Sequence, residues 1–240
     1  MTWIGLLAAV LAGVIVYWLF VLSEGIYLGS KVVIALYNWN ASSYDRVKQV
    51  QPHDDALHLA RPLLDALRGV DSPLVLDAAT GTARLPLALL RQWDFQGHIV
   101  GLDLSKRMLA IAQRKTQAHL HRVGLIREDA MALPFPGGIF DAVTCIEALE
   151  FLPQSGEALA EMVRVLRPGG RLLVSNRVGL DALFFPRRAY HPEVLERKLR
   201  ALGLTNVRTR RWQVHYDLIE AQKPWTSQKG ASCFALQREG

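Results

Sequence analysis

The chain has 240 residues, of which 50% are hydrophobic and 21% charged, and its formal net charge is +6. This composition argues against a disordered chain and leaves room for one α/β domain of ordinary size plus an extra segment. The basic residues are scattered in pairs rather than gathered in a stripe with aromatic residues between them, which favours membrane proximity over nucleic-acid binding. Cys145 and Cys233 have neither metal-ligand spacing nor a disulfide framework, and no histidine has a suitably spaced partner, so we expect no metal site.

The amino-terminal segment predicts a transmembrane helix. Residues 2–23 contain no charged side chain, and these 22 residues at about 1.5 Å each reach about 33 Å, close to the thickness of a bilayer core. A cleaved signal peptide would require a basic start and a shorter apolar run, and a buried core helix would have a polar face. The nearest basic residues, Lys31, Arg46 and Lys48, follow this run, which predicts a single-pass protein with its catalytic domain on the cytoplasmic side.

A second apolar stretch over residues 26–39 either continues the first helix or lies in the interface as an amphipathic segment. Residues 52–68 have leucines at helical spacing. We therefore predict an anchor over 1–25, interfacial and cap helices over 26–70, and a catalytic domain over 71–240.

From residue 73 onward, strands and helices alternate, which is typical of a doubly wound, mostly parallel sheet. Helices are expected around residues 85–90, after a cap at Ser105, over 157–166 and over 191–202. Residues 168–170, Pro-Gly-Gly, are expected to separate the third of these helices from a strand. The expected strands cover residues 74–76, 98–103, 123–126, 139–146 and 171–175, with a strand-rich region over 207–221 whose turn has no Gly or Pro to mark it, and residues 234–236 as a further strand.

The turn after the first strand predicts a nucleotide-type binding site. Asp77 lies at the carboxyl end of that strand, where open α/β sheets bind ligands. The residues that follow, 78–83, are nearly all small, and we expect Gly81 alone to adopt a positive φ. The dinucleotide pattern G-x-G-x-x-G fails after its first glycine, which argues against NAD.

Acidic residues follow each of the next strands. Asp103 is placed to accept hydrogen bonds from the ribose hydroxyls of an adenosine ligand, with a helix cap as the structural alternative. Asp129 is placed to reach the adenine edge, and Asp141 is expected to be structural. Glu147 and Glu150 follow the fourth strand, near the expected position of an acceptor.

These motifs together resemble the class I S-adenosylmethionine-dependent methyltransferases, and most closely the ubiquinone- and menaquinone-biosynthesis group. The similarity covers roughly residues 44–224. It rests on the segments 75–83, 100–105, 129–135, 140–143 and 161–170. This chain departs from the family at Ala79 and Ala83, where glycine is frequent.

The resemblance implies a Rossmann-like, seven-stranded α/β fold with S-adenosyl-L-methionine as cofactor. Asp77, Ala79 and Gly81 would flank its methionine part, Asp103 its ribose, and Asp129 with Ala130 its adenine. The full set of implied cofactor-binding residues is Tyr44, Asp77, Ala79, Gly81, Thr82, Asp103, Leu104, Met108, Asp129 and Ala130.

Methyl transfer requires a general base only where the acceptor must lose a proton. Glu147 and His191 are the candidates, although His191 also reads as the start of a helix. The predicted anchor suggests a small or lipid-like acceptor, such as a quinone precursor or a phospholipid. Residues 177–188, which mix aromatic and basic side chains, either dip into the headgroup region or form an ordinary packed loop. Two alternatives remain: a non-catalytic, membrane-tethered cofactor-binding scaffold, and a nucleic-acid methyltransferase.

Overall fold

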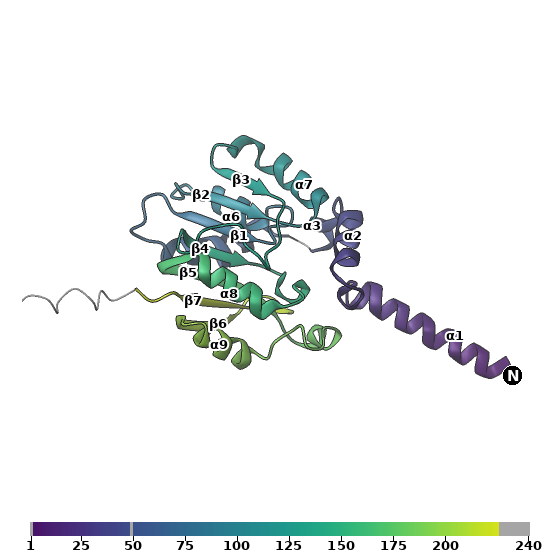
Figure 1. Ribbon diagram of the computed structural model, residues 1–240. Coiled ribbons are helices and arrows are strands. Elements are labelled where there is room, and N and C mark those ends of the chain that lie inside the picture. Colours follow the sequence, from purple (N-terminus) through teal and green to yellow (C-terminus); the bar gives the residue numbers. More distant parts are fainter. Residues whose placement is uncertain (1, 49, 226–240) are drawn as a thin grey trace, which may run out of the picture.

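The computed structural model describes residues 2–48 and 50–225, and the strand expected at 234–236 lies outside the described residues. A seven-stranded sheet forms the centre of the molecule, with strand order β3-β2-β1-β4-β5-β7-β6 (Figure 1). All neighbouring pairs are parallel except those made by β7. The strands are β1 (Leu74–Ala78), β2 (His98–Leu102), β3 (Val123–Ile126), β4 (Phe140–Cys145), β5 (Leu166–Arg177), β6 (Thr205–Arg211) and β7 (Tyr216–Gln222). The predicted doubly wound, mostly parallel sheet is confirmed.

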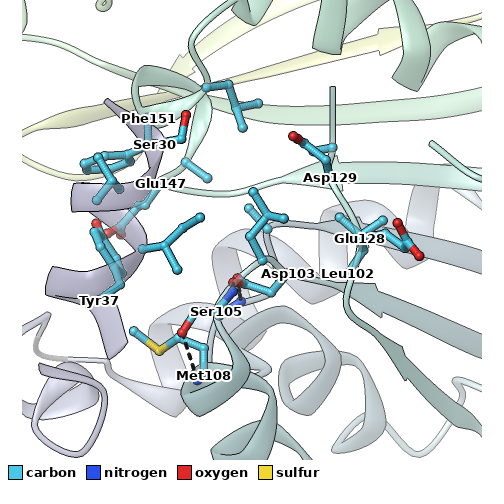
Figure 2. A pocket seen from close by; sticks show the side chains of 18 of the residues that line it. Ser30, Tyr37, Leu102, Asp103, Ser105, Met108, Glu128, Asp129, Glu147 and Phe151 are labelled. Carbon is cyan, nitrogen blue, oxygen red and sulfur yellow. Dashed lines mark hydrogen bonds between the residues drawn. The ribbon is translucent and has the colours of Figure 1, made fainter. Parts of the chain in front are cut away.

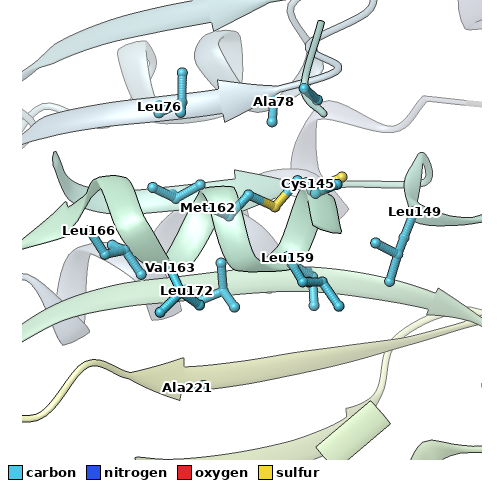
Figure 3. Close-up of a cluster of buried hydrophobic side chains, with 14 of the residues drawn as sticks. Leu76, Ala78, Cys145, Leu149, Leu159, Met162, Val163, Leu166, Leu172 and Ala221 are labelled. Carbon is cyan, nitrogen blue, oxygen red and sulfur yellow. The ribbon is translucent and has the colours of Figure 1, made fainter. Parts of the chain in front are cut away.

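Helices cover both faces of this sheet. Successive strand residues point to opposite faces, and each face carries apolar side chains that pack against helices. On one face, Leu76 and Val143 pack with Leu159 and Met162 of α8 (Figure 3). On the other face, Val75 packs in a second cluster with the leucines of α5 and α6. The helices of this part of the chain are α4 (Pro52–Asp55), α5 (Arg61–Ala66), α6 (Arg84–Leu90), α7 (Lys106–Thr116), α8 (Ser155–Val165) and α9 (Pro192–Ala201).

The helix predicted over 52–68 is interrupted by a π-helical segment, Ala56–Ala60, between α4 and α5. The predicted cap of α7 is confirmed, because the Ser105 hydroxyl accepts a hydrogen bond from the Met108 amide at 3.2 Å. In the region that sequence patterns left undivided, the turn between β6 and β7 covers residues 212–215.

Residues 168–170 were expected to precede the fifth strand, and this prediction is wrong. They lie inside β5, where the register against β4 shifts between Phe140 and Ala142. Gly169 has a φ of +80°. A Cβ on Gly170 would lie 2.8 Å from the Arg167 carbonyl oxygen, so the two glycines form an irregularity that the strand passes through.

The amino-terminal segment projects from the domain as a single exposed helix, α1 (Thr2–Tyr17), continued by a π-helical turn over Trp18–Leu22 (Figure 1). Residues Trp3–Leu22 form one helical stretch of 20 residues that is long and apolar enough to cross a membrane, and none of it is buried. The chain then turns at Gly25 and Gly29, with φ of 77° and 96°. It continues as α2 (Ser30–Asn40) and α3 (Tyr44–Val47), so the apolar stretch after residue 26 does not continue the first helix.

Candidate active site

A cleft of about 840 Å³, including the space at its open mouth, lies at the carboxyl ends of β1, β2 and β4. Figure 2 shows that α2 forms one side of this cleft and the end of β2 the other. The cleft is lined by eight of the ten predicted cofactor-binding residues: Tyr44, Ala79, Gly81, Asp103, Leu104, Met108, Asp129 and Ala130.

Asp103 follows β2 directly, and both of its carboxylate oxygens are fixed by backbone amides. The Gly81 amide donates to Oδ2 at 2.9 Å, and the Ser105 amide donates to Oδ1 at 2.7 Å. Burial raises the pKa of Asp103, and these two hydrogen bonds partly oppose that shift. The side chain therefore links the turns after β1 and β2 and also lines the cleft as a hydrogen-bond acceptor. A structural role and a role in binding a ribose are compatible.

In the turn after β1, three alternate residues have a left-handed backbone conformation. Ala79, Gly81 and Ala83 have φ of 56°, 55° and 68°, so the prediction that Gly81 alone adopts a positive φ is wrong. This conformation favours glycine and costs an alanine roughly 1–2 kcal/mol. Glycine at these two alanine positions would be free of this strain. A Cβ on Gly81 would meet nothing within 4 Å, so a ligand can approach this backbone closely.

The wall expected to hold an adenine is formed after β3. The Asp129 carboxylate accepts a hydrogen bond from the Met131 amide at 2.9 Å and thereby shapes the loop. Ala130 and Met108 are buried beside it, and Leu104 completes this side. These three side chains give this part of the cleft an apolar surface, which suits a planar ring.

Asp77 and Thr82, the other two predicted cofactor-binding residues, line a smaller cavity that adjoins the cleft. The Thr144 hydroxyl donates to Asp77 Oδ1 at 2.7 Å. Burial raises the pKa of Asp77 to about 6, although the hydrogen bond from Thr144 opposes the shift. The Thr82 hydroxyl donates to Asp45 Oδ1 at 2.5 Å, so Thr82 ties the turn to α3.

Glu147 lies in the cleft and in the adjoining cavity, in a left-handed conformation with φ of 50°. Its Oε1 accepts a hydrogen bond from Arg84 Nη1 at 2.6 Å, and Lys48 Nζ lies 3.9 Å from Oε2. Arg84 also binds the buried Asp55, at 2.7 Å. The carboxylate of Glu147 is therefore paired with cations while it faces the cleft, a partnership that sequence spacing did not reveal.

The other acidic and basic candidates lie elsewhere. His191 precedes α9, is exposed, and is not among the residues that line the cleft, so the structure gives it no place in the site. Asp141 accepts a hydrogen bond from the Leu74 amide at 2.6 Å, in the structural role expected of it. Glu150 is buried away from the cleft, with its Oε1 2.9 Å from Arg177 Nε.

The residues that sequence reasoning missed form the apolar wall of the cleft. Ser30, Val33, Ile34 and Tyr37 of α2 line one part of it. The segment after β4 supplies Phe151, Leu152 and Pro153, and the Phe151 ring meets Tyr37 edge-on at 5.4 Å between centroids. The apolar spacing of residues 26–39 was visible in the sequence, but it carried no information about which surface these residues cover.

The charge of the cleft restricts its ligands. Its described lining contains four carboxylates, Asp103, Glu128, Asp129 and Glu147, and neither lysine nor arginine. Such a surface attracts a cation and disfavours a phosphate-bearing dinucleotide. Within residues 2–48 and 50–225, no group of three or more His, Cys, Asp or Glu side chains is arranged to hold a metal ion.

Comparisons with known proteins identify this part of the chain. Residues 75–170 match the family model described as a methyltransferase domain. Over 131 residues the chain is 38% identical to a demethylmenaquinone methyltransferase of Listeria monocytogenes, a match that covers 54% of this chain and 55% of that protein. Residues 75–170 are thus a class I S-adenosylmethionine-dependent methyltransferase domain.

Two further similarities agree with this assignment. Over 134 residues, the chain is 39% identical to a demethylmenaquinone methyltransferase of Thermus thermophilus, covering 56% of this chain and 60% of that one. A SAM-dependent methyltransferase from Aquifex aeolicus has the same fold, with a TM-score of 0.59 at 19% identity over 73% of this chain and 95% of that one. The chain thus spans little more than half the length of the curated relatives that it matches.

The residues of the methyltransferase domain fit S-adenosylmethionine, whose sulfonium and ammonium groups are cationic. Asp103, Glu128 and Asp129 supply the complementary charge, and the open space over Gly81 leaves its backbone accessible. Asp103 offers oxygens to hydroxyl donors, and Leu104, Met108 and Ala130 give an apolar surface. Each part of the cofactor therefore has a chemically matched surface in the cleft.

Proposed function

We propose that the whole chain is a membrane-anchored methyltransferase that transfers a methyl group from S-adenosylmethionine to a lipid-like, quinone-type acceptor. One observation supports this most strongly: acidic residues after β2 and β3 and the apolar wall line the same cleft. The apolar wall includes α2, which follows the exposed apolar helix after a short turn. The curated relatives named as demethylmenaquinone methyltransferases support a quinone-type acceptor.

The chemistry requires little from the side chains beyond positioning. S-adenosylmethionine supplies an electrophilic methyl group, and the cleft must hold an acceptor in line with it. A quinol carbon or hydroxyl loses a proton during methylation, so a base close to the acceptor is useful. Glu147 is the candidate that faces the cleft, and Arg84 holds its carboxylate in place at 2.6 Å.

We also propose that the helix Trp3–Leu22 anchors the chain in a bilayer. In water, an exposed helix of this length would leave its apolar side chains in contact with solvent. The hydrocarbon core of a bilayer matches its length and removes these side chains from water. The basic residues Lys31, Arg46 and Lys48 follow the helix, which supports a cytoplasmic position for the methyltransferase domain.

The proposal is tested with the full chain in lipid nanodiscs and S-adenosylmethionine tritiated on its methyl group. The candidate acceptors are a prenylated naphthoquinol, phosphatidylethanolamine and total RNA. We expect label in the quinol, and the Asp103→Ala variant should lose this transfer. Asp94→Ala is the matched control, because Asp94 pairs with Arg61 on the surface at 2.8 Å, outside the lining of the cleft.

Each other outcome has a distinct meaning. Binding of S-adenosylmethionine without transfer to any of the three acceptors would favour the non-catalytic scaffold and contradict the proposal. Label in phosphatidylethanolamine would support a lipid acceptor at the membrane and would reject the quinone-type acceptor. Label in RNA, with a steep salt dependence of RNA binding, would instead indicate a nucleic-acid methyltransferase.

A further inference from the structure

Three large apolar side chains are exposed together on a part of the domain that the cleft does not use. Leu180, Leu183 and Val214 are 79%, 71% and 73% exposed. The first two lie on the loop of residues 179–188 between β5 and α9, and Val214 lies in the turn between β6 and β7. A soluble surface rarely holds such residues as a group without a binding role.

The loop and the turn form one surface. The Val178 amide donates to the His215 carbonyl at 2.8 Å, and His215 Nδ1 lies 3.3 Å from Asp181 Oδ2. These contacts fix the loop and the turn relative to each other. The exposed leucines and Val214 are therefore held together by the fold.

This surface lies beside the inner end of the apolar helix. Trp18 stacks on Tyr27 with ring centroids 5.0 Å apart, and the Tyr27 hydroxyl donates to the Pro186 carbonyl of the loop at 2.8 Å. Figure 1 shows the green segment between β5 and α9 on the side of the molecule from which α1 projects. Tryptophan and tyrosine at a helix end are typical of the interface between a bilayer and water.

Exposed basic side chains occur on the same segments as these apolar residues and at the start of α2. Arg187 and Arg211 are exposed on the loop and beside the turn, and Lys31 is exposed at the start of α2. Basic residues around exposed leucines match the anionic headgroups above an apolar bilayer core. Another protein chain would not require this combination at the end of an apolar helix.

The same loop contacts the apolar wall of the cleft. Phe185 meets Phe151 edge-on at 5.9 Å between centroids. Arg188 Nη1 donates to the Leu152 carbonyl at 2.8 Å. Phe151 and Leu152 both line the cleft, so the loop's position and that of the apolar wall are coupled.

We propose that Leu180, Leu183 and Val214 form a bilayer-contacting surface, which inserts into the headgroup region beside the anchor and brings the apolar wall of the cleft to the membrane. A lipid acceptor then reaches the apolar wall without crossing water, and this part of the inference rests on the proposed function. The contact with the bilayer is a separate claim, tested without turnover.

The test measures the depth of a label in the full chain, reconstituted in vesicles of phosphatidylcholine with anionic phosphatidylglycerol. An environment-sensitive fluorophore is attached at Leu183→Cys in a Cys233→Ser background, where the remaining Cys145 is buried. The matched control is Leu120→Cys, which is also exposed at 58% but precedes β3, at the opposite edge of the sheet. Lipids with a quencher near the headgroup report insertion.

We expect the label at residue 183 to shift to the blue and to be quenched about twofold or more, whereas the label at residue 120 stays in water. Equal, water-like signals at both positions would overturn the inference. A label at residue 183 that is shielded but not quenched by lipid, together with a cross-linked dimer, would assign the surface to a second copy and would also overturn it. Insertion without methyl transfer would leave the surface in place and reject only the proposed acceptor.

Discussion

The two walls of the cleft are built in different ways. The cofactor wall lies at the carboxyl ends of β1 and β2, where backbone amides hold Asp103 from both sides. The apolar wall combines α2 and the segment after β4, and the loop beyond β5 packs against it; side-chain contacts between distant parts of the chain join them. The difference shows that the strand ends and their turns carry most of the cofactor site, with Tyr44 of α3 added to it, whereas the acceptor side depends more strongly on how the amino-terminal segment docks.

One buried arginine connects the parts of the apolar wall. Arg177 Nε lies 2.9 Å from Glu150, its Nη2 donates to the Tyr216 hydroxyl at 2.6 Å, and it lies 3.5 Å from Glu24 just after the apolar helix. Glu24 in turn accepts a hydrogen bond from Tyr37 of α2 at 2.9 Å. The end of the anchor is thereby tied to the wall of the cleft.

The largest expected effect comes from Arg177→Met. Removing a buried cation leaves Glu150 buried without its partner, so the free energy of unfolding should fall by about 3–5 kcal/mol. The matched control is Arg200→Met, because Arg200 is half exposed and pairs with Glu196 along α9 at 2.9 Å; its loss should cost less than about 1 kcal/mol. Thermal melts of the full chain in detergent measure both. Equal losses would show that this network does not hold the apolar wall.

The cofactor wall is tested by Asp103→Ala. Losing a charged acceptor of two or more hydrogen bonds should weaken S-adenosylmethionine binding by about 100-fold, or about 3 kcal/mol. Asp103→Asn keeps the shape of the side chain and one acceptor oxygen, so its loss should be smaller. Titration calorimetry gives both affinities. An Asp103→Ala affinity within threefold of the unsubstituted chain would remove Asp103 from the cofactor site.

A third test uses pH. Because the folded pKa of Asp77, about 6, lies above its usual 3.8, the folded state binds more protons than the unfolded state between these values. Stability conferred by the neutral carboxyl is therefore lost as pH rises from about 4 to about 6, by about 2–3 kcal/mol. The Asp77→Asn variant has no carboxyl to ionise, so it does not lose this stability. Its free energy of unfolding, compared with that of the unsubstituted chain, should therefore rise from about pH 4 to about pH 6. Melts of both proteins at several pH values measure the difference, and a constant difference would contradict the buried environment assigned to Asp77.

The smallest expected effect concerns the strain in the turn after β1. Ala83 and Ala88 are both buried, but Ala83 has φ of 68° while Ala88 lies inside α6. Glycine relieves strain at the first position and weakens the helix at the second, so Ala88→Gly should be about 2 kcal/mol less stable than Ala83→Gly. Thermal melts compare them. Equal losses would show that the turn is unstrained.

The sequence predicted the cofactor wall well because its signals are local. Short apolar runs marked β1 to β4 to within two residues, and acids after the strands marked the ligand side of the sheet. The left-handed φ of Ala79 and Ala83 was not predictable from residue type, since alanine ordinarily avoids it. The glycines at 169 and 170 suggested a boundary, but pairing with neighbouring strands carried β5 through them.

The apolar wall could not be predicted because its contacts are tertiary. The pattern of α2 indicated an apolar face, but only the turn at Gly25 and Gly29 brings that face over the cleft. The pairing of Arg84 with Glu147 joins residues 63 positions apart, and no spacing rule links them. His191 was singled out by residue type alone, and the fold places it outside the lining of the cleft.

The most direct test of a methyltransferase that works against a membrane is a comparison of lipid extracts from cells with and without the gene. Mass spectrometry of both extracts, after growth with methionine isotopically labelled on its methyl group, measures the transferred methyl. We predict a quinone-type lipid that carries the labelled methyl with the gene and lacks that one CH₂ unit without it. Identical lipid extracts, with the gene-dependent label confined to soluble metabolites or RNA, would contradict the proposed function.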